Sequence, residues 1–186
     1  MEMKEFIQNG LESIKRVFDR TLDGLTSAEL KWQPRPDANS IGLILFHSIR
    51  AEDSSIHILQ GKPQLWESEK FYQKFHKAID DGGAHYTAEQ VAAFVVPDMK
   101  ELTAYADAVR KNTIVYLKGL KSEDFDKKVN LPPPPIRMVT PAGKPAPPWP
   151  PFKPIVGTML LMLMTHLSEH AGEISYIRGL KRGMDK

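Results

Sequence analysis

Residues 154–183, with the sequence PIVGTMLLMLMTHLSEHAGEISYIRGLKRG, decide the fold. Hydrophobic side chains recur in this stretch at spacings of three and four residues, which predicts one long amphipathic helix. Proline is well suited to a first helical turn, so we expect the helix to begin at about Pro154. Glycine is typical of a helix end, and we expect the helix to end near Gly179 or Gly183.

The same stretch contains two histidines, His166 and His170, four residues apart. On a helix their Cβ atoms lie about 6 Å apart on one face. Imidazole nitrogens bind a zinc-like ion at about 2.0–2.1 Å, so a single ion can be reached by both rings. The spacing differs from the HExxH motif of zinc proteases, because the glutamate precedes the second histidine. Two histidines at this spacing, taken alone, are also compatible with hydrogen-bonded or surface residues.

The surroundings of the pair favour a metal. The apolar side chains that continue the same stripe predict that both rings point into the protein; they are Met159, Met162, Leu163 and Ile177. Imidazoles facing an apolar interior without partners would cost a few kcal/mol each in lost solvation. A shared metal ion would remove that cost.

Three further helices are expected upstream of this one. Apolar spacing predicts them over residues 6–25, 41–59 and 87–119. Asn39 or Ser40 can cap the second helix, and Thr87 with Gln90 can form a capping box at the start of the third. Pro97 should kink or divide that third helix. Four long amphipathic helices without an alternating strand pattern predict an all-α four-helix bundle.

His47 lies inside an apolar helical stretch, residues 43–49, of the second helix. Neighbouring helix axes in a bundle are about 8–10 Å apart, so His47 could complete a set of three imidazoles with one to three open positions on the metal. Glu52, Glu169 and Glu173 could orient the rings from outside. Each of these carboxylates could instead lie on a solvated helix face, and we favour that alternative for Glu169.

Residues 131–154 contain 11 of the 15 prolines. Such a segment is stiff and extended, and it forms a long loop before the last helix. Long loops of this kind are often functional, so one hypothesis places the loop over or near the mouth of the metal site. The alternative, weighed equally, is a rigid strap that only connects two helices.

Composition excludes several classes of protein. The chain has no cysteine, so disulfides, zinc–thiolate sites and cysteine nucleophiles are ruled out. A net charge of +2 without a run of like charges argues against nucleic-acid binding. The N-terminus lacks the apolar run of a signal peptide, and residues 155–167, the most apolar stretch, are too few to span a membrane. We expect a cytoplasmic protein with one domain, residues 1–186.

Two segments resemble the DinB/YfiT-like superfamily. The first is WQP at residues 32–34 followed by NSIGLILFH at residues 39–47, which is similar to the second-helix motif of that family. The second is HLSEHAGEISYIRGL at residues 166–180, which is similar to its last-helix motif, H-x-x-x-H-x-G-x-x-x-x-x-R-G. The resemblance covers nearly the whole chain and implies an up-down-down-up four-helix bundle.

The resemblance also implies a function. It implies one divalent ion, nickel or zinc, bound by three histidines, which correspond to His47, His166 and His170. The family includes metal-dependent transferases that use low-molecular-weight thiols, so a small-molecule transferase with a thiol cosubstrate is the leading expectation. A metal-dependent hydrolase and a non-catalytic metal-binding or stress-responsive protein are the alternatives. The resemblance favours a homodimer.

Overall fold

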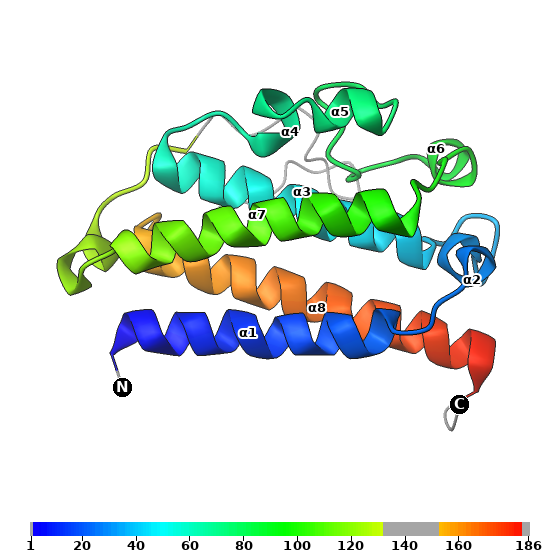
Figure 1. The fold of residues 1–186 in the computed structure, drawn as a ribbon, viewed down its shortest axis with the longest axis horizontal. Helices are drawn as coiled ribbons and strands as arrows, with labels where there is room; N and C mark the ends of the chain where they lie inside the picture. Colours follow the sequence, from blue (N-terminus) through cyan, green and yellow to red (C-terminus); the bar gives the residue numbers. More distant parts are fainter. Residues whose placement is uncertain (1, 132–152, 184–186) are drawn as a thin grey trace.

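Four long helices dominate the computed structural model, which describes residues 2–131 and 153–183 (Figure 1). They are α1 (Met3–Leu22), α3 (Ile41–Gln60), α7 (Met99–Gly119) and α8 (Val156–Arg182). The short helices are α2 (Ser27–Lys31), α4 (Leu65–Ser68), α5 (Phe71–Lys74), α6 (Ala88–Ala92) and the 3₁₀ helix η1 (Ser122–Asp126). In Figure 1, α1 and α8 run in one direction and α3 and α7 in the other. The predicted up-down-down-up bundle is therefore confirmed.

The helix boundaries follow local capping signals. The Ser40 side chain accepts a hydrogen bond from the backbone N–H of Leu43 and caps α3. Gly61, in the left-handed conformation, ends that helix. Thr87 and Gln90 form the expected capping box, but it opens only the short helix α6. The third predicted helix is divided rather than kinked, because Pro97 lies between α6 and α7.

The start of α8 differs from the prediction by two residues. The backbone N–H of Val129 donates to the carbonyl of Pro154 at 2.8 Å, and that of Val156 donates to Lys127 at 3.0 Å. These bonds hold the chain extended at Pro154, so the helix begins only at Val156. Residues 132–152 lie outside the described part of the chain, and the hypothesis on the Pro-rich loop stays untested.

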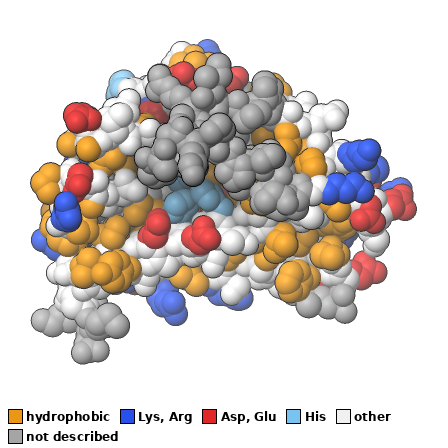
Figure 2. All heavy atoms as spheres, turned by 180° about the vertical axis from the view of Figure 1, so that it is seen from behind, with side chains coloured by type: hydrophobic (Ala, Val, Ile, Leu, Met, Phe, Trp, Pro, Cys, Tyr) orange, Lys and Arg blue, Asp and Glu red, His pale blue; other side chains and the backbone are white. Residues whose placement is uncertain are grey.

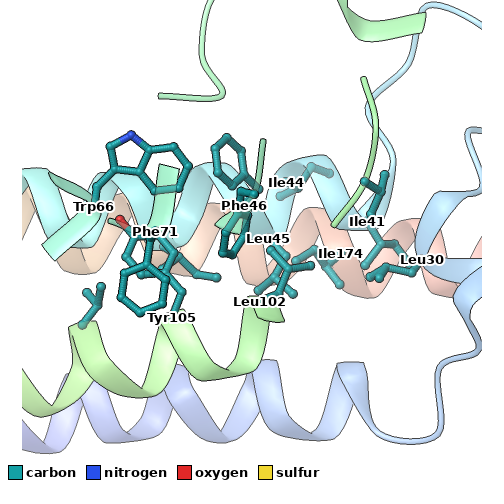
Figure 3. Packing of buried hydrophobic residues seen from close by; sticks show 14 of the residues in the cluster. Leu30, Ile41, Ile44, Leu45, Phe46, Trp66, Phe71, Leu102, Tyr105 and Ile174 are labelled. Carbon is teal, nitrogen blue, oxygen red and sulfur yellow. The ribbon is translucent and has the colours of Figure 1, made fainter. Parts of the chain in front are cut away.

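Hydrophobic side chains fill the space between the four long helices. Trp66, Phe46 and Tyr105 lie at the aromatic end of the core, where α4 and α7 pack against α3 (Figure 3). α8 packs against both α1 and α3, and α7 packs against α3, whereas α1 and α7 contact each other much less. The bundle thus places α3 and α8 side by side along much of their length.

None of the helices in residues 2–131 and 153–183 is long and apolar enough to cross a membrane.

Candidate metal centre

The structure brings the three predicted histidines together from two helices. His47 lies on α3, and His166 and His170 lie one turn apart on α8. The Nε2 atom of His166 is 3.1 Å from Nε2 of His47 and 3.2 Å from Nε2 of His170. All three side chains are half-buried, and the three nitrogens lie within 4.8 Å of one another. Histidine side chains are visible, with acidic side chains beside them, on the face seen in Figure 2.

These separations suit a single ion. Two nitrogens that each lie about 2.0–2.1 Å from one ion are about 2.8–3.0 Å apart at the right angle of an octahedral site and about 3.3–3.4 Å apart in a tetrahedral site, so the two geometries span about 2.8–3.4 Å. Both Nε2–Nε2 distances fall in that range. A set of three imidazoles leaves at least one position on the ion free for another ligand.

The outer ring nitrogens fix which tautomer two of the histidines adopt. His47 Nδ1 lies 3.0 Å from the carbonyl oxygen of Gly82, which can only accept, so Nδ1 carries the proton. His170 Nδ1 donates in the same way to the Glu173 carboxylate at 2.6 Å. In both rings Nε2 therefore directs a lone pair toward His166. A proton on His166 Nε2 can be donated to only one of these two nitrogens, whereas a cation between the rings can accept a lone pair from all three.

Two of the histidines, His47 and His166, are also held in the neutral form that a metal ligand needs. Burial, followed by the charges of the neighbouring His170 and His47, lowers the pKa of His166 to about 4. Burial likewise lowers the pKa of His47, although its hydrogen bond to Gly82 opposes the shift. His47 and His166 therefore offer unprotonated nitrogens to a metal ion at neutral pH.

A turn at residues 80–83 supplies the carbonyl that orients His47. Gly83 has a φ of 69°, and a Cβ atom there would lie 2.8 Å from the Phe46 ring and 3.3 Å from the Cα atom of His47. Only glycine fits this close approach. The buried Arg50 donates from Nε to the carbonyl of Asp81 at 3.0 Å and thereby attaches the turn to α3.

Of the three carboxylates proposed to orient the histidine rings, only one contacts a histidine. Glu173 contacts His170 as predicted. Glu169 is exposed, in agreement with the alternative favoured for it. Glu52 contacts none of the three histidines; it is buried and accepts from Arg110 at 2.9 Å and from Thr113 at 2.7 Å. The hypothesis for Glu52 was wrong, because its helix position turns it away from His47 toward α7.

Two contributors to the site were not predicted from the sequence. The Gly82 carbonyl is a backbone group, and its role cannot be predicted from the type of residue at that position. Arg50 carried a weak signal, since an arginine within an apolar helix needs buried partners. His76 and His85 are exposed, and with His57 they lie outside the histidine group.

Comparisons with known proteins show the family and the fold of the chain. A family model described as the DinB superfamily matches residues 11–174. A solved structure from Enterococcus faecalis, described as a conserved protein, superposes with a TM-score of 0.74. It is 23% identical, and the match covers 97% of this chain and 97% of the other, which establishes a shared fold. No curated protein matches the sequence.

Proposed function

The chain belongs to the DinB superfamily, whose members generally bind metals, and on that basis we propose that it binds one divalent ion through His47, His166 and His170. The observation that carries the proposal is the orientation of the rings. The outer nitrogens of His47 and His170 are engaged by Gly82 and Glu173, so their inner nitrogens converge on one point. Imidazole ligands suit zinc and nickel, which are the expected ions.

We further propose catalysis on a small molecule, with a low-molecular-weight thiol as cosubstrate. When bound, a divalent ion lowers the pKa of a thiol or water at its open position and so supplies a nucleophile at neutral pH. Burial favours the neutral form of His47 and His166, and the hydrogen bonds to Gly82 and Glu173 fix the direction of the His47 and His170 rings. The support for a thiol rather than water is the superfamily membership, because three imidazoles accept either.

Metal content tests the first proposal. Protein purified without a polyhistidine tag should carry about one equivalent of zinc or nickel per chain by elemental analysis after gel filtration. His166→Ala and His170→Ala should each lose most of it. His76→Ala is the matched control, because His76 is exposed and lies outside the histidine group. Equal metal content in all four proteins would contradict the assignment.

Cobalt substitution tests the second proposal. The visible spectrum of the cobalt protein should change when glutathione, bacillithiol, mycothiol or coenzyme A is added, because a sulfur ligand alters the absorption of the ion. The same protein should consume the thiol in the presence of an electrophile, and His47→Ala should abolish that rate. A cobalt site that responds to none of these thiols would exclude thiol transfer and favour hydrolysis by water or a non-catalytic role.

A further inference from the structure

A second cavity lies where the bundle is least closed, between α1 and α7. These two helices contact each other less than the other neighbouring pairs of long helices do, and in Figure 1 α8 is visible between them. Polar side chains line the opening; Lys15 and Asp19 come from α1, and Asp107 comes from α7. Behind them is a cavity of about 120 Å³.

The walls of this α1–α7 cavity are apolar and come from all four long helices. They include Phe18, Leu22, Leu45, Ile49, Leu102 and Leu167. An apolar cavity of about 150 Å³ in another protein holds a benzene molecule. The volume here therefore suits one ring or a short branched chain.

One end of the cavity is charged. Glu52 is only 5% exposed and lines the cavity together with Arg110, its ion-pair partner. The carboxylate accepts from Arg110 and Thr113, whereas a carboxylate offers about four acceptor positions. A buried acceptor with spare capacity favours a ligand that brings a hydrogen-bond donor.

The α1–α7 cavity is separate from the metal centre, although both are lined by side chains from α3 and α8. None of the three histidines lines it. Its floor includes Ser48 and Leu167, which directly follow His47 and His166 in the sequence. Successive residues on a helix point about 100° apart, so the histidines face one side of α3 and α8 while the cavity faces another.

We propose that the α1–α7 cavity is a second small-molecule site, which takes a mainly apolar molecule of about one ring with a hydrogen-bond donor directed at Glu52. The inference is independent of the metal. A ligand there would contact the reverse side of the two helices that carry the histidines.

Phenol is the probe for this site, with benzene as its matched analogue without a donor. Phenol should bind the full-length protein with a dissociation constant of about 0.1–1 mM, as expected for a ligand of its size. Benzene should bind at least about tenfold more weakly, because it brings no donor for the remaining acceptor positions of the Glu52 carboxylate. Equal affinities would overturn the assignment of Glu52.

The location is tested by NMR contacts and by filling the cavity. Phenol ring protons should show contacts to the methyl group of Ala106, which lines the cavity. Ala106→Leu should weaken phenol binding at least about tenfold. Ala104→Leu, which adds the same atoms at an exposed position on α7, should leave it unchanged.

Two results would overturn the location of the site. Phenol that contacts other methyl groups but not Ala106 binds elsewhere, and this result needs only the wild-type protein if Ala106→Leu does not fold. Equal binding of phenol to both leucine variants would also place the phenol outside this cavity. Both measurements are made on metal-free and zinc-loaded protein, so failure of the metal proposal leaves them interpretable.

Discussion

Glu173 lies one helical turn after His170, and its carboxylate accepts a hydrogen bond from the ring at 2.6 Å. Because this bond fixes the tautomer and raises the basicity of the inner nitrogen, we predict that Glu173→Gln weakens zinc binding by about tenfold. Competition with a chromophoric chelator would measure the affinity.

Glu169→Gln is the matched control, since Glu169 is exposed on the same helix and its replacement removes the same charge. The zinc affinity of this variant should stay within about twofold of the wild type. Equal losses in the two variants would mean that the negative charge of the helix, and not the bond to His170, supports the ion.

Gly83 allows a second residue-scale test. We predict that Gly83→Ala lowers the free energy of unfolding by about 2–4 kcal/mol, because alanine is strained at positive φ and its Cβ atom would clash with Phe46. Urea unfolding would measure the loss. The zinc affinity should fall as well, since the turn that orients His47 must shift.

Gly24→Ala separates the cost of backbone strain at positive φ from the cost of the clash with Phe46. Gly24 has a φ of 62°, but an added Cβ atom there has no neighbour within 4 Å among the described atoms. That variant should lose only about 1–2 kcal/mol, the cost of the left-handed conformation. A loss as large as that of Gly83→Ala would show that packing against Phe46 has no part in the effect.

At the scale of elements, a buried polar network joins α3, α4 and α7. Asp53 on α3 accepts from the backbone N–H groups of Leu65 and Trp66 at the start of α4. The Tyr105 hydroxyl on α7 donates to the same carboxylate at 2.7 Å and accepts from Arg50 at 3.1 Å. Through Arg50 this network also reaches the turn that orients His47.

We predict that Tyr105→Phe lowers the free energy of unfolding by about 1–3 kcal/mol, because Arg50 and Asp53 each lose a partner in a buried position. Chemical denaturation would measure it. Tyr176→Phe removes the same atom from a side chain that is 69% exposed, and it should change stability by less than about 0.5 kcal/mol. If both variants are equally stable, the Tyr105 hydroxyl contributes nothing to the attachment of α7 to α3.

For the whole molecule, the features that could be predicted from the sequence are those set by residues close together in the chain. The long helices follow from apolar spacing, and the Ser40 cap marks the start of α3. His166 and His170 could be paired because their contact spans four residues. The Gly82 carbonyl lies 35 positions from His47, and Asp81 lies 31 from Arg50. Contacts over such separations depend on how the 64–86 segment folds back, which no periodic pattern encodes.

The α1–α7 cavity could not be predicted from the sequence for a related reason. Apolar spacing shows which face of each helix is buried, but it leaves open which pair of helices closes least well. That depends on the sizes of side chains from four different helices, which meet only in the folded bundle.

The proposed ion would join α3 to α8, so the stability of the whole bundle should depend on it. A ligand that binds only the folded state at 100 times its dissociation constant adds about 2.7 kcal/mol. For a chain of this length that corresponds to a rise in Tm of about 5–10 °C. We therefore predict that zinc raises the Tm of metal-free protein by this amount in differential scanning calorimetry, and that EDTA reverses the rise.

His47→Ala tests whether the ion stabilises the bundle by joining α3 to α8 or only by binding to one helix. With His47 removed, zinc could reach only His166 and His170, which lie on the same helix, so the shift in Tm should fall to about 2 °C or less even where some zinc still binds. His76→Ala, at an exposed position outside the group, should keep the full shift. A shift that survives His47→Ala unchanged would place the stabilising ion on α8 alone. The link between α3 and α8 would then rest on hydrophobic packing.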